Sequence, residues 1–119
     1  MRATLNRIQR AFHAIQRWLS EQFMSMVAAE RSLVLKRHSG SEDAVVVKFF
    51  VPEQIPQGDW QCQYEIRGGP IQHIHRTIGI DSVQALSLAL AGVRTELDFF
   101  ARKHSAEFFF LDEPGHEFK

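Results

Sequence analysis

The sequence contains a single cysteine, Cys62, among its 119 residues. One thiol cannot form an intrachain disulfide, which excludes a small disulfide-stapled scaffold and favours a reducing compartment, most simply the cytoplasm. The composition also indicates no membrane span, and the formal net charge is +0. That neutrality argues against the acidic surface of a carrier protein and against the basic surface of a nucleic-acid-binding domain.

The residues that are present have the composition of a globular domain. Hydrophobic residues make up 45% and charged residues 24%, and 119 residues are enough to bury a core in one domain. The charges are unevenly placed, because Arg2, Arg7, Arg10 and Arg17 precede the first acidic residue, Glu21. The other end of the chain is acidic and carries Asp112, Glu113 and Glu117.

Residues 1–28 are predicted to form a separate N-terminal segment with one amphipathic helix over 3–27. Its apolar positions recur at steps of three and four residues: Leu5, Ile8, Phe12, Ile15, Leu19 and Met26, with Gln22 in one slot. Such a stripe has to be covered by the rest of this domain, by a second copy of the chain through a short heptad seam, or by a membrane surface. The basic first half also resembles an organelle transit peptide. An intramolecular or dimer role is the favoured interpretation.

Residues 29–119 are predicted to form a single α+β domain. Four strands come first, over 31–37, 44–51, 60–67 and 71–80; a long helix over 82–103 and a last strand over 107–111 follow. The strand at 44–51 (AVVVKFFV) is apolar on both faces, which predicts a central position. The strand at 60–67 alternates cleanly, so that Trp60, Cys62, Tyr64 and Ile66 are expected to point inward.

The direction of successive strands predicts the topology. Four antiparallel strands, a helix back across the sheet and a fifth strand beside the first give a five-stranded, mainly antiparallel sheet of order 5-1-2-3-4, with the succession β-β-β-β-α-β. The helix is expected to face the sheet with the stripe Val83, Leu86, Leu90, Val93, Leu97 and Phe100. The second face is expected to be largely polar, through Lys48, Gln61, Gln63, Glu65, Arg67, His73, His75 and Thr77. Either the N-terminal helix covers this face or another protein does.

Residues 79–90 read GIDSVQALSLAL, and the letters around Ser82 resemble the phosphopantetheine attachment motif of carrier proteins. Carrier proteins are acidic helical bundles, whereas the fifty residues before Asp81 here have strand and turn patterns. The same letters also have a structural explanation, because Asp81 can cap the helix and Gln84, three positions later, completes a capping box. We therefore predict a helix start at Ser82 and no attachment site.

His73 and His75 are the strongest candidates for a metal site. Two residues apart on a strand, they share a face, as paired metal-binding imidazoles can. No third histidine or cysteine lies at a supporting spacing, and Cys62 is expected in the core, so no metal is predicted. The ordinary interpretation is two histidines on a solvated sheet face, and pH-sensitive or interfacial hydrogen bonding is a second possibility. A small-ligand-binding or metal-assisted enzyme that uses His73, His75, Arg76 and Asp81 stays as the alternative.

Arg76 conflicts with the expected pattern. It lies between Ile74 and Ile78, on the face that the alternation assigns to the interior. Three explanations are open: the guanidinium pairs with an acid, extends past the sheet edge to water, or contacts a ligand.

Three stretches of the chain resemble an uncharacterised bacterial domain family of unknown function. They are Glu30-Arg31-x-Leu33, Asp59-Trp60-x-Cys62-x-Tyr64-x-Ile66 and Gly79-x-Asp81-Ser82-Val83-Gln84-Ala85-Leu86. The likeness covers about residues 29 to 112 and leaves out the N-terminal helix. It implies no reaction and no catalytic residues, but it does imply that the DSVQAL motif accompanies strands and belongs to the fold.

These observations together predict a non-enzymatic, cytoplasmic protein-interaction module without a cofactor, a metal or catalytic residues. Its expected binding residues lie on a sheet face and edge: Gln63, Glu65, Arg67, His73, His75 and Arg76. A concrete form is an immunity- or antitoxin-like protein that covers the active site of a toxin. Self-association through the N-terminal helix is a further expected interaction, whereas nucleic acid is not an expected partner and membrane contact is not favoured.

Overall fold

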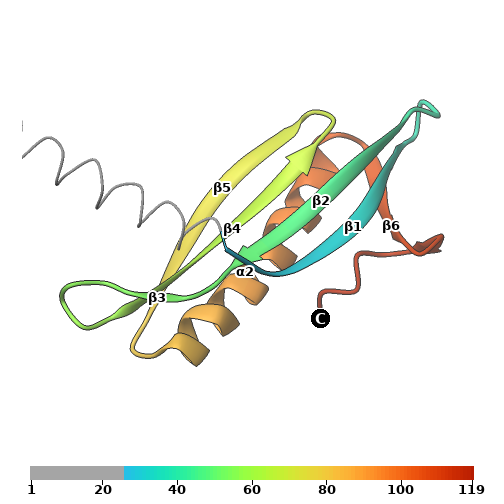
Figure 1. Ribbon diagram of the computed structural model, residues 1–119. Helices are drawn as coiled ribbons and strands as arrows, with labels where there is room; N and C mark the ends of the chain where they lie inside the picture. Colours follow the sequence, from blue (N-terminus) through green and yellow to red (C-terminus); the bar gives the residue numbers. More distant parts are fainter. Residues whose placement is uncertain (1–25) are drawn as a thin grey trace, which may run out of the picture.

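A computed structural model describes residues 26–119, in which one long helix packs on one face of an antiparallel sheet (Figure 1). The predicted α+β class is therefore confirmed. The N-terminal helix expected over residues 3–27 lies outside the described residues, except at its very end. There the chain is already extended, because residues 27 and 28 belong to the first strand.

The elements follow one another as β1 (Val27–Arg37), β2 (Glu42–Phe50), β3 (Glu53–Gln54), β4 (Trp60–Gly68), β5 (Ile71–Gly79), α2 (Ser82–Lys103), β6 (Ala106–Phe110) and β7 (Glu113–Pro114). The strands form one seven-stranded sheet in the order β3-β4-β2-β1-β6-β7, and β5 pairs with β4. The predicted count of five strands is therefore wrong, and the order differs from the prediction by the short strands β3 and β7. The five longer strands have the predicted neighbours, in the order β6-β1-β2-β4-β5.

Two short strands account for the difference. Pro52 cannot donate a ladder hydrogen bond and interrupts the chain after β2, and β3 then resumes the pairing with β4. β7 pairs with β6 through only two residue pairs. A strand of two residues is too short to show an alternation of apolar and polar side chains. The periodicity that predicts the longer strands therefore cannot predict β3 and β7.

The core lies between the sheet and α2. It is built from alternate side chains of the strands together with one side of the helix, and its buried strand residues are Leu33, Leu35, Val45, Val47, Phe49, Cys62, Tyr64, Ile66, Ile71 and Phe108. The predicted inward positions Cys62, Tyr64 and Ile66 of β4 are confirmed, with exposures of 1% or less. Figure 1 shows α2 crossing behind the strands, so that the helix covers one face of the sheet, and no element between residues 26 and 119 covers the other.

α2 has the predicted limits, and its buried side overlaps the predicted stripe: Val93 and Leu97 are buried, and Leu86 and Phe100 are partly buried against the core. Its buried residues are Ala85, Ala89, Val93 and Leu97. Val83 is 69% exposed and Leu90 is 43% exposed, although both were expected to face the sheet. The reason is the close approach that small side chains permit: the hydroxyl of Thr77 in β5 donates to the carbonyl of Ala85 at 2.6 Å, a contact that larger side chains at the interface would prevent.

The pairing of β4 with β5 reverses the predicted orientation of β5. Gly68 pairs with Ile71 across a two-residue loop, and this register places His75 opposite Tyr64 and His73 opposite Ile66. Residues directly opposite in an antiparallel pair lie on the same face. Both histidines therefore face the α2 side, and the prediction that they share the outer face with Gln63 is wrong.

Candidate functional site

Four of the six residues predicted to bind a partner lie together on the sheet face away from α2. Gln63, Glu65 and Arg67 alternate along β4, and Arg76 of β5 pairs in register with Gln63. The Arg76 guanidinium donates from Nη1 to Oε1 of Gln61 at 3.3 Å. Within β4, Arg67 Nη2 lies 3.1 Å from Oε1 of Glu65, and the two side chains form an exposed ion pair. The face thus carries both charge signs and the amide groups of two glutamines.

Two isoleucines that sequence reasoning assigned to the interior complete this face. Ile74 is 50% exposed and Ile78 is 47% exposed, and they flank Arg76 on β5. Within residues 26–119 no element packs over them, because α2 contacts β5 from the other side (Figure 1). We call Gln61, Gln63, Glu65, Arg67, Ile74, Arg76 and Ile78 the open face. The orientation of Arg76 toward solvent resolves the conflict that the sequence pattern raised.

The other two predicted residues, His73 and His75, form a cluster of rings under the edge of α2. Their imidazoles stack with a centroid distance of 6.2 Å. Tyr64 lies beneath both, with its ring centroid 5.6 Å from that of His75, and Phe100 of α2 meets His73 edge-on at 5.6 Å. The structure thus separates the histidines from the open face: His73 belongs to the contact between sheet and helix, and His75 lies exposed beside it.

Glu96 of α2 brings a carboxylate to this cluster. Its Oε2 lies 3.6 Å from Nε2 of His73, a buried nitrogen to which no residue from 26 to 119 offers a hydrogen bond. Burial and the Glu96 charge raise the pKa of Tyr64 to about 12. The phenol therefore stays protonated and neutral at physiological pH.

Neither the imidazoles nor the thiol of Cys62 belongs to a larger set of reactive groups. In the part of the chain from residue 26 onward, no three side chains of His, Cys, Asp or Glu gather as a metal site would require. Cys62 is buried in the core, and burial raises the pKa of its thiol, which disfavours the reactive thiolate. The alternative hypothesis of an enzyme built on His73 and His75 stays a prediction.

The start of α2 has the predicted cap. Asp81 Oδ1 accepts a hydrogen bond from the backbone N–H of Gln84 at 2.7 Å. The reciprocal bond reaches one residue further back than in a standard capping box, because Gln84 Oε1 accepts from the N–H of Ile80 at 2.7 Å. Ser82 is the first residue of a helix that packs on a sheet, an architecture different from a helical carrier domain.

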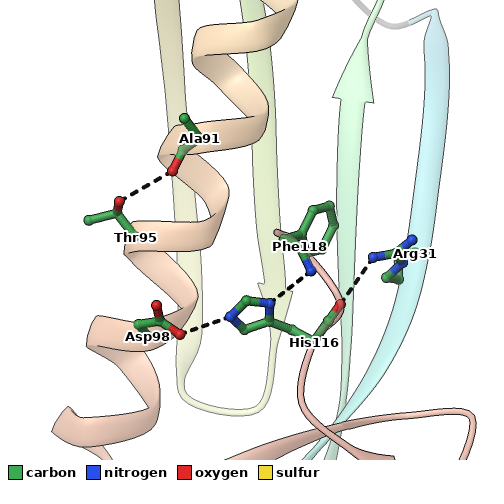
Figure 2. A network of polar contacts seen from close by, with 6 residues as sticks. All are labelled: Arg31, Ala91, Thr95, Asp98, His116 and Phe118. Atoms are coloured by element: carbon green, nitrogen blue, oxygen red, sulfur yellow. Dashed lines mark hydrogen bonds and ion pairs between the residues drawn. The ribbon is translucent and has the colours of Figure 1, made fainter.

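The C-terminal tail contributes a polar network that sequence reasoning did not find (Figure 2). His116 lies between β1 and α2: its backbone carbonyl accepts from Arg31 Nη1 at 3.0 Å, and its ring Nε2 lies 2.8 Å from Asp98 Oδ1. Because His116 Nδ1 accepts from the N–H of Phe118 at 3.1 Å, the neutral ring carries its proton on Nε2 and donates it to Asp98. Arg31 also stacks over the ring of Phe118. The tail is thus tied to both layers of the domain.

These features define a small α+β domain with one helix-covered and one open sheet face. Residues 29–119 match the model of a protein family described as a domain of unknown function (DUF6968), and the chain belongs to this family. The predicted membership of an uncharacterised domain family is thereby confirmed. Comparisons with curated proteins and with solved structures gave no significant match. The helix found between residues 26 and 119 is not apolar enough to cross a membrane.

Proposed function

We propose that this chain is a non-enzymatic protein-interaction module that binds a partner protein through the open face of β4 and β5. The observation that carries the proposal is the half-exposure of Ile74 and Ile78 on a sheet face that α2 does not cover. Each isoleucine would gain on the order of 1 kcal/mol if a partner buried its remaining apolar surface.

The polar residues around the isoleucines support a protein as the partner. Arg76 lies between them, and Gln63 and Gln61 lie opposite on β4. An apolar centre framed by arginine and amide groups is typical of protein interfaces, in which hydrogen bonds at the rim fix the orientation of the partner. Insertion into a membrane surface would instead bury the ion pair between Arg67 and Glu65, at a high cost in desolvation.

The predicted immunity- or antitoxin-like role is one form of this proposal. In that form the partner is a toxin whose active site is covered by the open face. Arg67 and Arg76 are both exposed here, so acidic groups on the partner would complement them. Complementary charges increase the rate of association and the selectivity for one partner.

A site-specific photo-crosslinking experiment tests the proposal. A photoreactive amino acid placed at Ile78 should form an adduct with one partner, which mass spectrometry then identifies. The matched control position is Leu88 of α2, which is 44% exposed, close to the 47% of Ile78, but lies outside the open face. An adduct at Ile78 that links two copies of the chain would support the same face as a self-association surface.

Binding measurements on the identified partner give the quantitative test. Ile74→Glu should weaken the affinity at least about tenfold, because a charge replaces apolar surface at the centre of the interface. Leu88→Glu should leave the affinity unchanged. Equal affinities of the two variants, or an adduct at Leu88 without one at Ile78, would refute the proposed binding face.

A further inference from the structure

A second exposed apolar surface lies on the opposite side of the sheet, next to α2. It is a groove of about 330 Å³ between the beginning of β1, the first half of α2 and the C-terminal tail. Its walls are residues 28–31 of β1, Leu86 and Leu90 of α2, and the rings of Phe49 and Phe118. Ala28 and Ala29 leave room along the strand, so the groove floor is open to a docked element.

The surroundings of this groove are apolar as well. Val83, Leu86 and Leu90 follow one another at steps of three and four residues and form a stripe along α2, of which Val83 and Leu90 are largely exposed. Met26 is 53% exposed and Val27 is 42% exposed at the start of β1. Among the described strands, none pairs with this end of β1 on the β6 side, because β6 pairs only with residues 34–37. Exposed apolar side chains therefore surround Met26, the first described residue.

The segment that precedes this point has the pattern of a fitting occupant. Residues 1–25 join the domain at Met26, two residues before the groove wall begins. Their apolar residues recur at helical spacing, and a helix of that length would extend over roughly 35 Å, about as far as the 22 residues of α2. The segment therefore has both the stripe and the reach to lie alongside α2.

The charges are complementary too. The segment carries Arg7, Arg10 and Arg17 before its first acid. On the described side, the acids that line the groove and the adjoining pocket beside the tail outnumber the bases: Glu30, Asp98, Glu107 and Glu117 against Arg31 and Lys119. Positive side chains on the outer sides of a docked helix would thus meet a negative rim, which favours one docking surface over others.

We propose that the N-terminal segment of the same chain docks as an amphipathic helix in the groove between α2 and the start of β1. Its apolar stripe covers Leu86, Leu90 and Phe118, so that α2 becomes sandwiched between the sheet and the segment. The open face lies on the other side of the sheet and stays free. This inference is therefore independent of the proposed protein-binding function, and either can fail alone.

Limited proteolysis of the full chain tests the docking. Trypsin can cut the segment at Arg10 and Arg17, and cutting requires the segment to leave the groove. Leu90→Glu places a charge in the groove wall and should accelerate cleavage at Arg17 about tenfold, which corresponds to the loss of one buried leucine contact. Leu88→Glu is the matched control, because Leu88 and Leu90 are 44% and 43% exposed on the same helix but only Leu90 lines the groove. The control variant should be cut at the wild-type rate.

Leu90→Glu could accelerate cleavage by destabilising the domain itself, so a second variant changes the segment instead of the groove. Leu19→Glu changes the segment and leaves the described core intact, and it should accelerate cleavage at Arg10 to a similar extent. Unchanged cleavage in both Leu90→Glu and Leu19→Glu would overturn the proposal. The proposal would also be overturned if the wild-type chain were a dimer in solution and Leu90→Glu were a monomer, because the segment would then dock on a second copy. Binding of the wild-type chain to anionic vesicles that Leu19→Glu abolishes would likewise assign the stripe to a membrane.

Discussion

Tyr64 is the residue at which the sheet, the helix and the two edge imidazoles meet. Its ring is buried with an exposure of 1%, and its hydroxyl lies under Gly92 of α2, where an added Cβ would come within 3.0 Å of the oxygen. A tyrosinate at this position would be poorly solvated and close to the negative charge of Glu96, which explains the raised pKa of the phenol. The residue acts as a packed neutral side chain rather than as a base.

The raised pKa of Tyr64 predicts a pH dependence of stability. Because the folded state holds the proton more tightly than the unfolded state, the contribution is fully present below pH 10.0 and is lost as the pH rises through about 12. The chain has only one tyrosine, so the absorbance of tyrosinate reports this group alone. We expect a native titration midpoint near pH 12 and a midpoint near 10 in denaturant.

The matched variant in this titration is Glu96→Gln. Removal of the carboxylate charge should lower the native midpoint of Tyr64, but it should stay above the unfolded value, because burial is the larger cause of the shift. A native midpoint equal to that of the denatured chain would show that the phenol is hydrated and that α2 does not cover it.

At the scale of elements, Gly79 shows how closely α2 approaches the sheet. A Cβ at this position in β5 would lie 2.5 Å from the backbone nitrogen of Ala85 and 3.0 Å from its Cα. Backbone atoms cannot rotate away, so Gly79→Ala has to displace the first turn of α2. We expect a loss of roughly 2 kcal/mol in the free energy of unfolding, measured by denaturant titration.

Gly92→Ala is the comparison for this substitution. Its added methyl would meet the side chain of Tyr64 at 3.0 Å, and the better helix propensity of alanine offsets the strain by up to about 1 kcal/mol. The variant should therefore stay within about 1 kcal/mol of the wild type. Equal losses at Gly79 and Gly92 would contradict the close contact between β5 and the start of α2.

The elements also show which parts of the fold the sequence can predict. The limits of α2 and the Asp81 cap follow from local signals, namely the capping residues and the helical spacing of apolar side chains. The buried side of α2 follows only in part, because the helix is apolar on two sides and the sheet selects Ala85 and Ala89 for their size. A hydrophobicity pattern ranks Leu90 above Ala89, so it predicts the burial of Val93 and Leu97 correctly but also includes the exposed Leu90.

For β5, the sequence predicts the wrong outer face for a different reason, whereas for β4 it predicts the right one. The alternation in β5 is ambiguous, since isoleucines and histidines occupy its two sides in turn. The two-residue loop of Gly69 and Pro70 contains the missing information, because loop length fixes the register with β4 and thereby the side of every following residue. A register deduced from this loop length places Ile74 and Ile78 on the open face.

At the scale of the whole molecule, the C-terminal tail joins parts of the chain that are far apart in sequence. The bond from Arg31 to the carbonyl of His116 spans 85 positions, and no local pattern can predict such a contact. The tail also brings Phe118 to Phe49, with ring centroids 5.8 Å apart, and Arg31 lies 4.5 Å over the Phe118 ring. It thereby covers core side chains that α2 leaves open and forms one wall of the groove proposed for the N-terminal segment.

The relative weight of the two tail contacts can be predicted. Phe118→Ala removes a ring packed on the core and should lower the free energy of unfolding by roughly 2 kcal/mol. Asp98→Ala removes only the partner of His116, and the Asp98 side chain is 51% exposed, so the loss should be below about 1 kcal/mol. Denaturant titrations of both variants measure these losses. A larger loss for Asp98→Ala than for Phe118→Ala would mean that the hydrogen bond, and not the aromatic ring, holds the tail against the domain.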